Sequence, residues 1–198
     1  MKWILASQSP RRKALFSLIS PEFEVRPSAF NENSVTADTP KELTMLLAQK
    51  KAESVPHAAD EAVVGCDTVV ALENEVLGKP ENRADAKRML DALSGKTHAV
   101  YTGVCVLYGE KRLVFAERTD VTFFALSEEE IESYLDTEEP YDKAGAYGIQ
   151  GRAALFVERI TTSWDCPPHV LPGRFAANGR KKLQIPKKAA KNAEKFTN

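Results

Sequence analysis

The feature that most constrains the fold is an uninterrupted apolar run at residues 62–66 (Ala-Val-Val-Gly-Cys). No polar residue alternates within it, which is typical of a strand buried on both faces of a sheet. Around it, apolar residues at helical spacing (43–52 and 83–93) alternate with two long β-rich runs (99–108 and 112–125). This mixture predicts an α/β fold, with a mixed twisted sheet flanked by helices.

Composition and charge exclude several classes of protein. The 198 residues carry a net charge of −1, which predicts no general affinity for nucleic acid or acidic membranes. Lys2 precedes an apolar run of only four residues, Trp3–Ala6, too short for a signal peptide or a membrane span. The three cysteines are far apart and have no zinc or disulfide spacing, which favours a reducing, cytoplasmic environment.

Residues 7–12 (Ser-Gln-Ser-Pro-Arg-Arg) follow the short apolar run and open an amphipathic one, which predicts strand, turn and helix start. Ser9 suits the N-cap and Pro10 the first helical position. The hydroxyls of Ser7 and Ser9, the free amides of a helix start and the planar guanidinium groups of Arg11 and Arg12 suit a polyphosphate. The alternative is a capped surface helix with solvated arginines.

Asp67 directly follows the buried run, so we expect it at the carboxyl end of that strand. Ligand crevices in open α/β sheets lie outside such ends. One carboxylate there can bind Mg²⁺, whose other ligands would be phosphates and water, and can accept a proton from an attacking water. Cys66 and Thr68 flank it and could orient it. The alternative is an aspartate that starts a turn.

Several lysines could supply positive charge to such a site. Lys79 stands in a rigid Gly-Lys-Pro frame that can present its ammonium group to a phosphate. Lys50 and Lys51 lie on an expected helix, and one of them could face the same site. For each of these lysines the alternative is a solvated side chain on a turn or a helix.

Residues 137–152 are rich in glycine and polar side chains, and loops of this length are more often functional than not. Gln150 offers both a hydrogen-bond donor and an acceptor, which suits the edge of a nucleobase. Tyr147 is interpreted as a packing residue, and 153–160 as a final strand. His57 and His98 are interpreted as surface or loop residues that form no metal cluster.

Four motifs together resemble those of the Maf family, over residues 2 to 160. In chain order they are Ser-Gln-Ser-Pro-Arg-Arg (7–12), Gly-Cys-Asp-Thr (65–68), Gly-Lys-Pro (78–80) and Asp-Lys-Ala-Gly-Ala-Tyr-Gly-Ile-Gln-Gly (142–151). Maf proteins are nucleoside triphosphate pyrophosphatases, historically called septum-formation inhibitors. The sequence is similar to the Bacillus-type members of the family.

The resemblance implies a fold like that of inosine triphosphate pyrophosphatases, with two lobes around a cleft. It implies hydrolysis of a nucleoside triphosphate to the monophosphate and pyrophosphate with Mg²⁺ or Mn²⁺. Asp67 matches the family's proposed proton acceptor, and we assign it the metal as well. The intact Tyr-Gly-Ile-Gln-Gly segment favours dTTP, UTP and modified pyrimidine nucleotides as substrates. A homodimer is a further expectation.

Nine residues form the expected substrate-binding set. Within the family, the positions of Arg11, Thr68 and Gln150 distinguish the dTTP/UTP branch from the 7-methyl-GTP branch. The whole set is Ser7, Ser9, Arg11, Arg12, Glu32, Lys51, Thr68, Lys79 and Gln150.

A second hypothesis is that the cleft binds a nucleotide without hydrolysing it. The chain would then be a nucleotide-sensing regulator of septum formation and cell division. The presence of Asp67 together with Lys79 and both arginines favours catalysis over sensing.

We expect one two-lobed catalytic domain over residues 1–160 and an atypical, poorly ordered basic tail over 161–198. The tail carries eight Lys and Arg against two acids, whereas the first 160 residues carry 19 against 26. Family members usually continue with a Gly-Leu-Pro turn and a helix. Reading the codons of residues 164–167 in a shifted frame gives Gly-Leu-Pro/Ser, so we interpret the tail as frameshifted. The alternative is a divergent tail.

Overall fold

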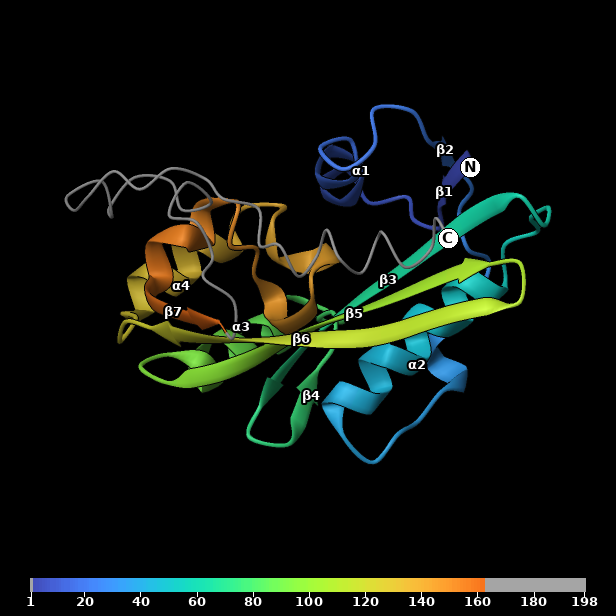
Figure 1. Cartoon of the computed structure of the whole chain (residues 1–198). Helices are drawn as coiled ribbons and strands as arrows, with labels where there is room; N and C mark the ends of the chain where they lie inside the picture. Colours follow the sequence, from blue (N-terminus) through green and yellow to red (C-terminus); the bar gives the residue numbers. More distant parts are fainter. Residues whose placement is uncertain (1, 163–198) are drawn as a thin grey trace. The chain divides into compact units, whose positions relative to one another are not determined.

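The computed structural model describes residues 2–162 (Figure 1). The expectations for the basic tail, including the shifted reading frame, therefore lie almost entirely outside the described residues. Within the described residues, no helix is long and apolar enough to cross a membrane.

Seven strands form one mixed sheet in the order β2-β1-β3-β5-β6-β7, and β4 pairs with β3 outside this path. The β1–β2 and β1–β3 pairs are parallel, and the other pairs are antiparallel. The strands are β1 (Lys2–Leu5), β2 (Glu24–Val25), β3 (Glu61–Leu72), β4 (Glu75–Leu77), β5 (Thr97–Tyr108), β6 (Lys111–Phe123) and β7 (Val157–Thr162).

Within residues 2–162, four α-helices and four short 3-10 helices join these strands. The α-helices are α1 (Pro10–Phe16), α2 (Pro40–Glu53), α3 (Arg83–Leu93) and α4 (Glu128–Leu135). The 3-10 helices are η1 (Glu32–Ser34), η2 (Pro140–Asp142), η3 (Ala144–Ala146) and η4 (Arg152–Phe156). The expected α/β class, with helices on a mixed sheet, is confirmed.

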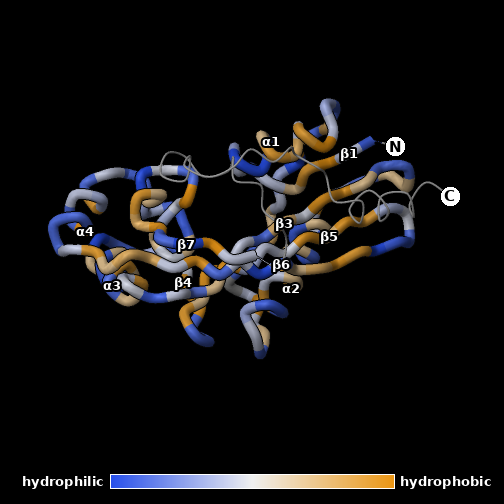
Figure 2. The backbone as a smooth tube through the Cα atoms, turned by 60° about the vertical axis from the view of Figure 1, so that its left-hand side comes forward, coloured by the Kyte–Doolittle hydropathy of each residue, from blue (hydrophilic) through white to orange (hydrophobic). Residues whose placement is uncertain are grey.

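Helices α1 and α2 cover opposite faces of the sheet near β1 (Figure 1). Helix α2 approaches closely because two strand residues facing it are glycines. A Cβ atom on Gly65 would lie 2.3 Å from the carbonyl oxygen of Ala48, and one on Gly103 would lie 2.3 Å from that of Thr44. On the other face, Phe16 of α1 packs in a small apolar cluster. The hydrophobic colour along β1 and β3 in Figure 2 marks strands buried between these layers.

Helices α3 and α4 pack on the other end of the long strands (Figure 1). Leu90 and Leu93 of α3 and Ile131 of α4 share a second core with Phe123 of β6. Because β3, β5 and β6 have 12 or 13 residues each, they support both cores.

Local signals in the sequence placed most elements correctly. The helix expected over 83–93 has those bounds, and Asn82 caps it by accepting from the amide of Asp85. Residues 127–130 (Ser-Glu-Glu-Glu) have the sequence pattern of a capping box. The structure contains it, with Ser127 and Glu130 exchanging hydrogen bonds. The two long β-rich runs form β5 and β6, joined by a tight turn at Gly109.

Two expectations about strand bounds are wrong. The strand that begins in the apolar run does not end at Cys66 but continues to Leu72, because β5 pairs with it along its whole length. The strand expected from residue 153 begins only at Val157. The preceding residues form η4, because the amides of Arg152 and Ala153 donate to the carboxylate of Glu139.

Candidate active site

The site lies where one edge of β3 is open. Strand β1 pairs with β3 up to Val64, and β4 begins to pair with it at Val70. In the described part of the chain, no strand flanks β3 on this side over residues 65–69. Asp67 therefore does not stand at a strand end, as the sequence suggested, but in the middle of a strand, at a gap between two neighbours.

Asp67 is only 4% exposed and is paired with Lys51 of α2. The Lys51 Nζ atom donates to Asp67 Oδ1 at 2.5 Å, and it lies 2.8 Å from Glu32 Oε1. The buried position of Lys51 contradicts the alternative of a solvated helix lysine for this residue. Burial raises the pKa of Asp67 above its ordinary value, and the positive charge of Lys51 opposes that rise.

Arg12 occupies the open edge of β3. Its Nη1 atom donates to the carbonyl oxygen of Cys66 at 2.7 Å, and its Nη2 atom donates to Thr68 Oγ1 at 3.3 Å. The positive charge of Arg12, like that of Lys51, opposes the rise in the pKa of Asp67. Arg12 thus binds the two residues that flank Asp67. One of these partners is a backbone oxygen, which sequence reasoning missed because backbone groups carry no sequence signal.

The two serines of the first motif lie in the turn that leads into α1. Ser7 is buried, and its Oγ accepts from the amide of Ser9 at 3.2 Å. Ser9 stands at the N-cap of α1 and Pro10 at its first position, but the Ser9 side chain makes no capping hydrogen bond. Ser9 therefore occupies the expected N-cap position, but the side-chain hydrogen bond of this turn comes from Ser7 and not from Ser9.

The glycine-rich segment brings the remaining motifs to the same region. The amide of Gly145 donates to the carbonyl oxygen of Gly78 at 2.9 Å, which ties the segment to the neighbour of Lys79. A Cβ atom on Gly148 would lie 3.4 Å from Arg11 Nη1. The positive charge of Arg11 also lowers the pKa of Asp142. Arg11 therefore lies against the segment that contains Gln150.

The nine expected residues are thus brought together to different degrees. Direct contacts join Lys51 to both Glu32 and Asp67, and Arg12 to Thr68. Lys79 and Gln150 have exposed side chains, and the hydrogen bond from Gly145 to Gly78 brings the glycine-rich segment next to the residue before Lys79.

The donor atoms fit a small hard cation that also takes ligands from its substrate. The carboxylates of Glu32 and Asp67 both lie within ion-pair distance of one atom, Lys51 Nζ. Mg²⁺ is typically bound by one or two carboxylates and completes its octahedron with phosphate oxygens and water. Among residues 2–162 there is no group of three or more His, Cys, Asp or Glu side chains that could hold a metal ion without a substrate.

The interpretation of His98 as a surface residue is wrong. His98 is 2% exposed, and its Nε2 atom lies 2.7 Å from the hydroxyl of Tyr147. Its ring also packs edge-on against Phe123 and Tyr147. Tyr147 packs in the core as expected. The sequence around His98 gave no signal that its partner would come from the glycine-rich segment.

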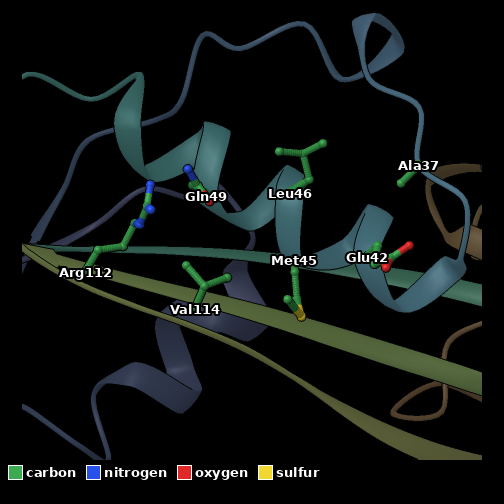
Figure 3. A pocket seen from close by; sticks show the side chains of 7 residues that line it. All are labelled: Ala37, Glu42, Met45, Leu46, Gln49, Arg112 and Val114. Atoms are coloured by element: carbon green, nitrogen blue, oxygen red, sulfur yellow. The ribbon is translucent and has the colours of Figure 1, made fainter.

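A groove of about 410 Å³ lies elsewhere, between α2 and β6 (Figure 3). Met45, Leu46 and Gln49 line it from α2, and Arg112 and Val114 line it from β6. None of the expected substrate-binding residues takes part in its lining, so we do not assign it to the substrate.

The fold and the site define the class of protein: an α/β protein with arginine and lysine side chains next to a buried carboxylate. Comparison with known proteins identifies the family. The family described as Maf-like protein matches residues 2–166. The chain belongs to the Maf family, as the motifs suggested.

Named relatives support this membership. The dTTP/UTP pyrophosphatase of Bacillus cytotoxicus is 51% identical over 160 residues, which cover 80% of this chain and 84% of the relative. That of Bacillus cereus is 50% identical over the same length. Among solved structures, the Staphylococcus aureus Ham1 protein is 17% identical and has a TM-score of 0.46, covering 62% of this chain and 72% of that one.

Proposed function

We propose that this chain is a nucleoside triphosphate pyrophosphatase that hydrolyses dTTP and UTP to the nucleoside monophosphate and pyrophosphate, with Mg²⁺ or Mn²⁺. Relatives that share half of its residues over 160 positions are named dTTP/UTP pyrophosphatases. The observation that carries the proposal for this chain is the buried Asp67 at the open edge of β3, with Lys51 and Arg12 beside it.

The cationic side chains hold the triphosphate. Cleavage of a phosphoanhydride bond depends mainly on positioning and on neutralising the charge of the phosphate oxygens. Arg11, Arg12 and Lys79 supply that charge, and the two guanidinium groups can each bind two oxygens at once. Gln150, two residues beyond Gly148, hydrogen-bonds the edge of the pyrimidine.

Asp67 accepts the proton of the attacking water. Its burial makes it a stronger base than an ordinary aspartate, because desolvation disfavours the ionised form. Lys51 holds one carboxylate oxygen in place, and its positive charge favours the ionised form of the group. When bound between Glu32, Asp67 and the phosphates, the divalent cation would withdraw charge from the phosphate oxygens.

An Asp67→Asn substitution tests the assignment, because it keeps the shape of the side chain but removes the base. We expect pyrophosphate release to fall by about 100-fold or more, while nucleotide binding by calorimetry persists. Asp91→Asn, at an exposed carboxylate of α3, is the matched control and should keep its activity. Near-normal hydrolysis by the Asp67 variant would remove this residue from the mechanism.

The same assay separates the enzyme from the nucleotide sensor. A sensor would bind dTTP or UTP tightly and release no pyrophosphate, whereas an enzyme releases it in step with nucleotide consumption. We place the reaction in the cytoplasm and the substrate in solution, with no membrane or nucleic-acid partner. The homodimer suggested by the family resemblance stays a prediction, which light scattering would test.

A further inference from the structure

The end of the glycine-rich segment is held by the carboxylate of Glu139, a residue to which the motif analysis gave no role. Glu139 Oε2 accepts from the amide of Arg152 at 2.9 Å, and Oε1 accepts from the hydroxyl of Tyr134 at 3.1 Å. The Glu139 carbonyl oxygen also accepts from Lys143 Nζ at 2.8 Å. One residue thus joins α4, the start of the segment and the first turn of η4.

Gly151 leaves room for this carboxylate. A Cβ atom on Gly151 would lie 2.1 Å from Glu139 Oε1, far inside van der Waals contact. The backbone of Gly151 has φ −115°, an extended conformation that any residue can adopt. The glycine therefore leaves room for the Glu139 carboxylate where the structure places it, and the backbone conformation does not call for a glycine.

A second buried contact holds the segment on its other side. Tyr147 bonds His98 of β5 through its hydroxyl, and it is 7% exposed. Between Tyr147 and Gly151 lie only three residues, and they include Gly148, which lies against Arg11, and the exposed Gln150. Two anchors on separate elements therefore bracket the short stretch that lies against Arg11.

We propose that Glu139 is a positioning residue for substrate recognition, which holds residues 148–151 so that Gln150 meets the nucleobase. This inference rests on the proposed function for the identity of the ligand. Glu139 itself does not contact the substrate. Glu139 affects binding of the base, whereas Arg11, Arg12 and Lys79 bind the phosphates.

The products of the reaction provide separate probes for the two ends of the site. UMP carries the base and one phosphate, whereas pyrophosphate carries no base. For Glu139→Ala, calorimetry with the full chain and Mg²⁺ should show UMP binding weakened about tenfold and pyrophosphate binding changed less than about twofold. The KM for UTP should rise by a similar factor, while kcat changes less, because a positioning contact to the base acts in both ground and transition states.

Two further variants serve as controls. Glu138→Ala removes the neighbouring exposed carboxylate and should match the wild type. Glu139→Gln keeps the length of the side chain and one amide acceptor, so it should recover part of the UMP affinity lost in Glu139→Ala.

A double-mutant cycle tests the geometry independently of any ligand. Gly151→Ala should lower the melting temperature in the wild-type background, because its methyl group meets the Glu139 carboxylate. In the Glu139→Ala background the same change should cost much less, since the space is then free. Equal costs in both backgrounds would overturn the packing on which the proposal depends.

Each outcome has a distinct meaning. If the wild type releases no pyrophosphate, the proposed function fails, and the UMP and pyrophosphate measurements still decide this inference. Equal weakening of UMP and pyrophosphate in Glu139→Ala would show a general structural role and overturn the positioning role. Unchanged UMP binding in that variant, or no UMP binding by the wild type, would overturn it as well.

Discussion

The buried imidazole of His98 makes the stability of this protein depend on pH between 7 and 5. Burial lowers the pKa of His98 from 6.5 to about 4. Its Nδ1 atom has no hydrogen-bond partner within residues 2–162, so a proton added there would meet no acceptor. We therefore predict that acidification destabilises the wild type and that a His98→Gln variant loses this dependence.

The size of the effect follows from linkage. The unfolded chain takes up a proton at His98 near pH 6.5, whereas the folded protein does so only near pH 4. Because the unfolded state binds more protons in that interval, the free energy of unfolding falls as the pH falls through it. Each pKa unit corresponds to about 1.4 kcal/mol, so about 2 kcal/mol is lost by pH 5 and about 3 kcal/mol by pH 4.

Urea unfolding at pH 7, 6 and 5 measures this loss. With a denaturant slope of about 2 kcal/mol per molar, the midpoint of the wild type should fall by about 1 M between pH 7 and pH 5. Carboxylates with lowered pKa values, such as Glu24, contribute mainly below pH 5, and comparison with His98→Gln separates the histidine from every other titrating group. The reasoning is refuted if the wild type shows no fall, or if His98→Gln shows the same fall.

Two further predictions concern packing and capping. Gly65→Ala should lower the free energy of unfolding by about 3 kcal/mol, because its methyl group would meet the backbone of α2, whereas Gly78→Ala, with open space around it, should change it by less than about 0.5 kcal/mol. Urea midpoints compare the two, and similar losses would contradict the close approach of α2. Ser127→Ala should cost about 1 kcal/mol by removing the capping box of α4, and an unchanged midpoint would show that tertiary packing alone holds that helix.

Most of the fold was predictable because its elements carry local signals. The capping box at Ser127, the turn at Gly109 and the apolar spacing of residues 83–93 act over a few neighbours in the chain. The family membership was predictable for a different reason, since four short motifs in one order are jointly specific. Strand bounds were less accurate, because whether β3 ends at Cys66 or Leu72 depends on its partner β5 and not on its own residues.

The site was predictable as a set of residues but not as a geometry. Sequence reasoning grouped Asp67, Lys51 and Arg12, yet it placed the aspartate at a strand end and gave each lysine an equally ordinary surface alternative. It also misplaced His98, whose partner Tyr147 lies 49 positions away along the chain. It gave no role to Glu139, which accepts from the amide of Arg152, 13 positions away.

By itself, the amino-acid sequence determined the fold class, the main helices and strands and the family, because each depends on short-range patterns of apolar spacing, capping and motif order. Only the tertiary structure decided that β3 has an open edge between β1 and β4, that Lys51 is buried against Asp67, and that Glu139 fills the space beside Gly151. These features depend on which distant segments meet, and the physical reason is that burial and charge pairing are properties of the packed chain and not of any stretch of it.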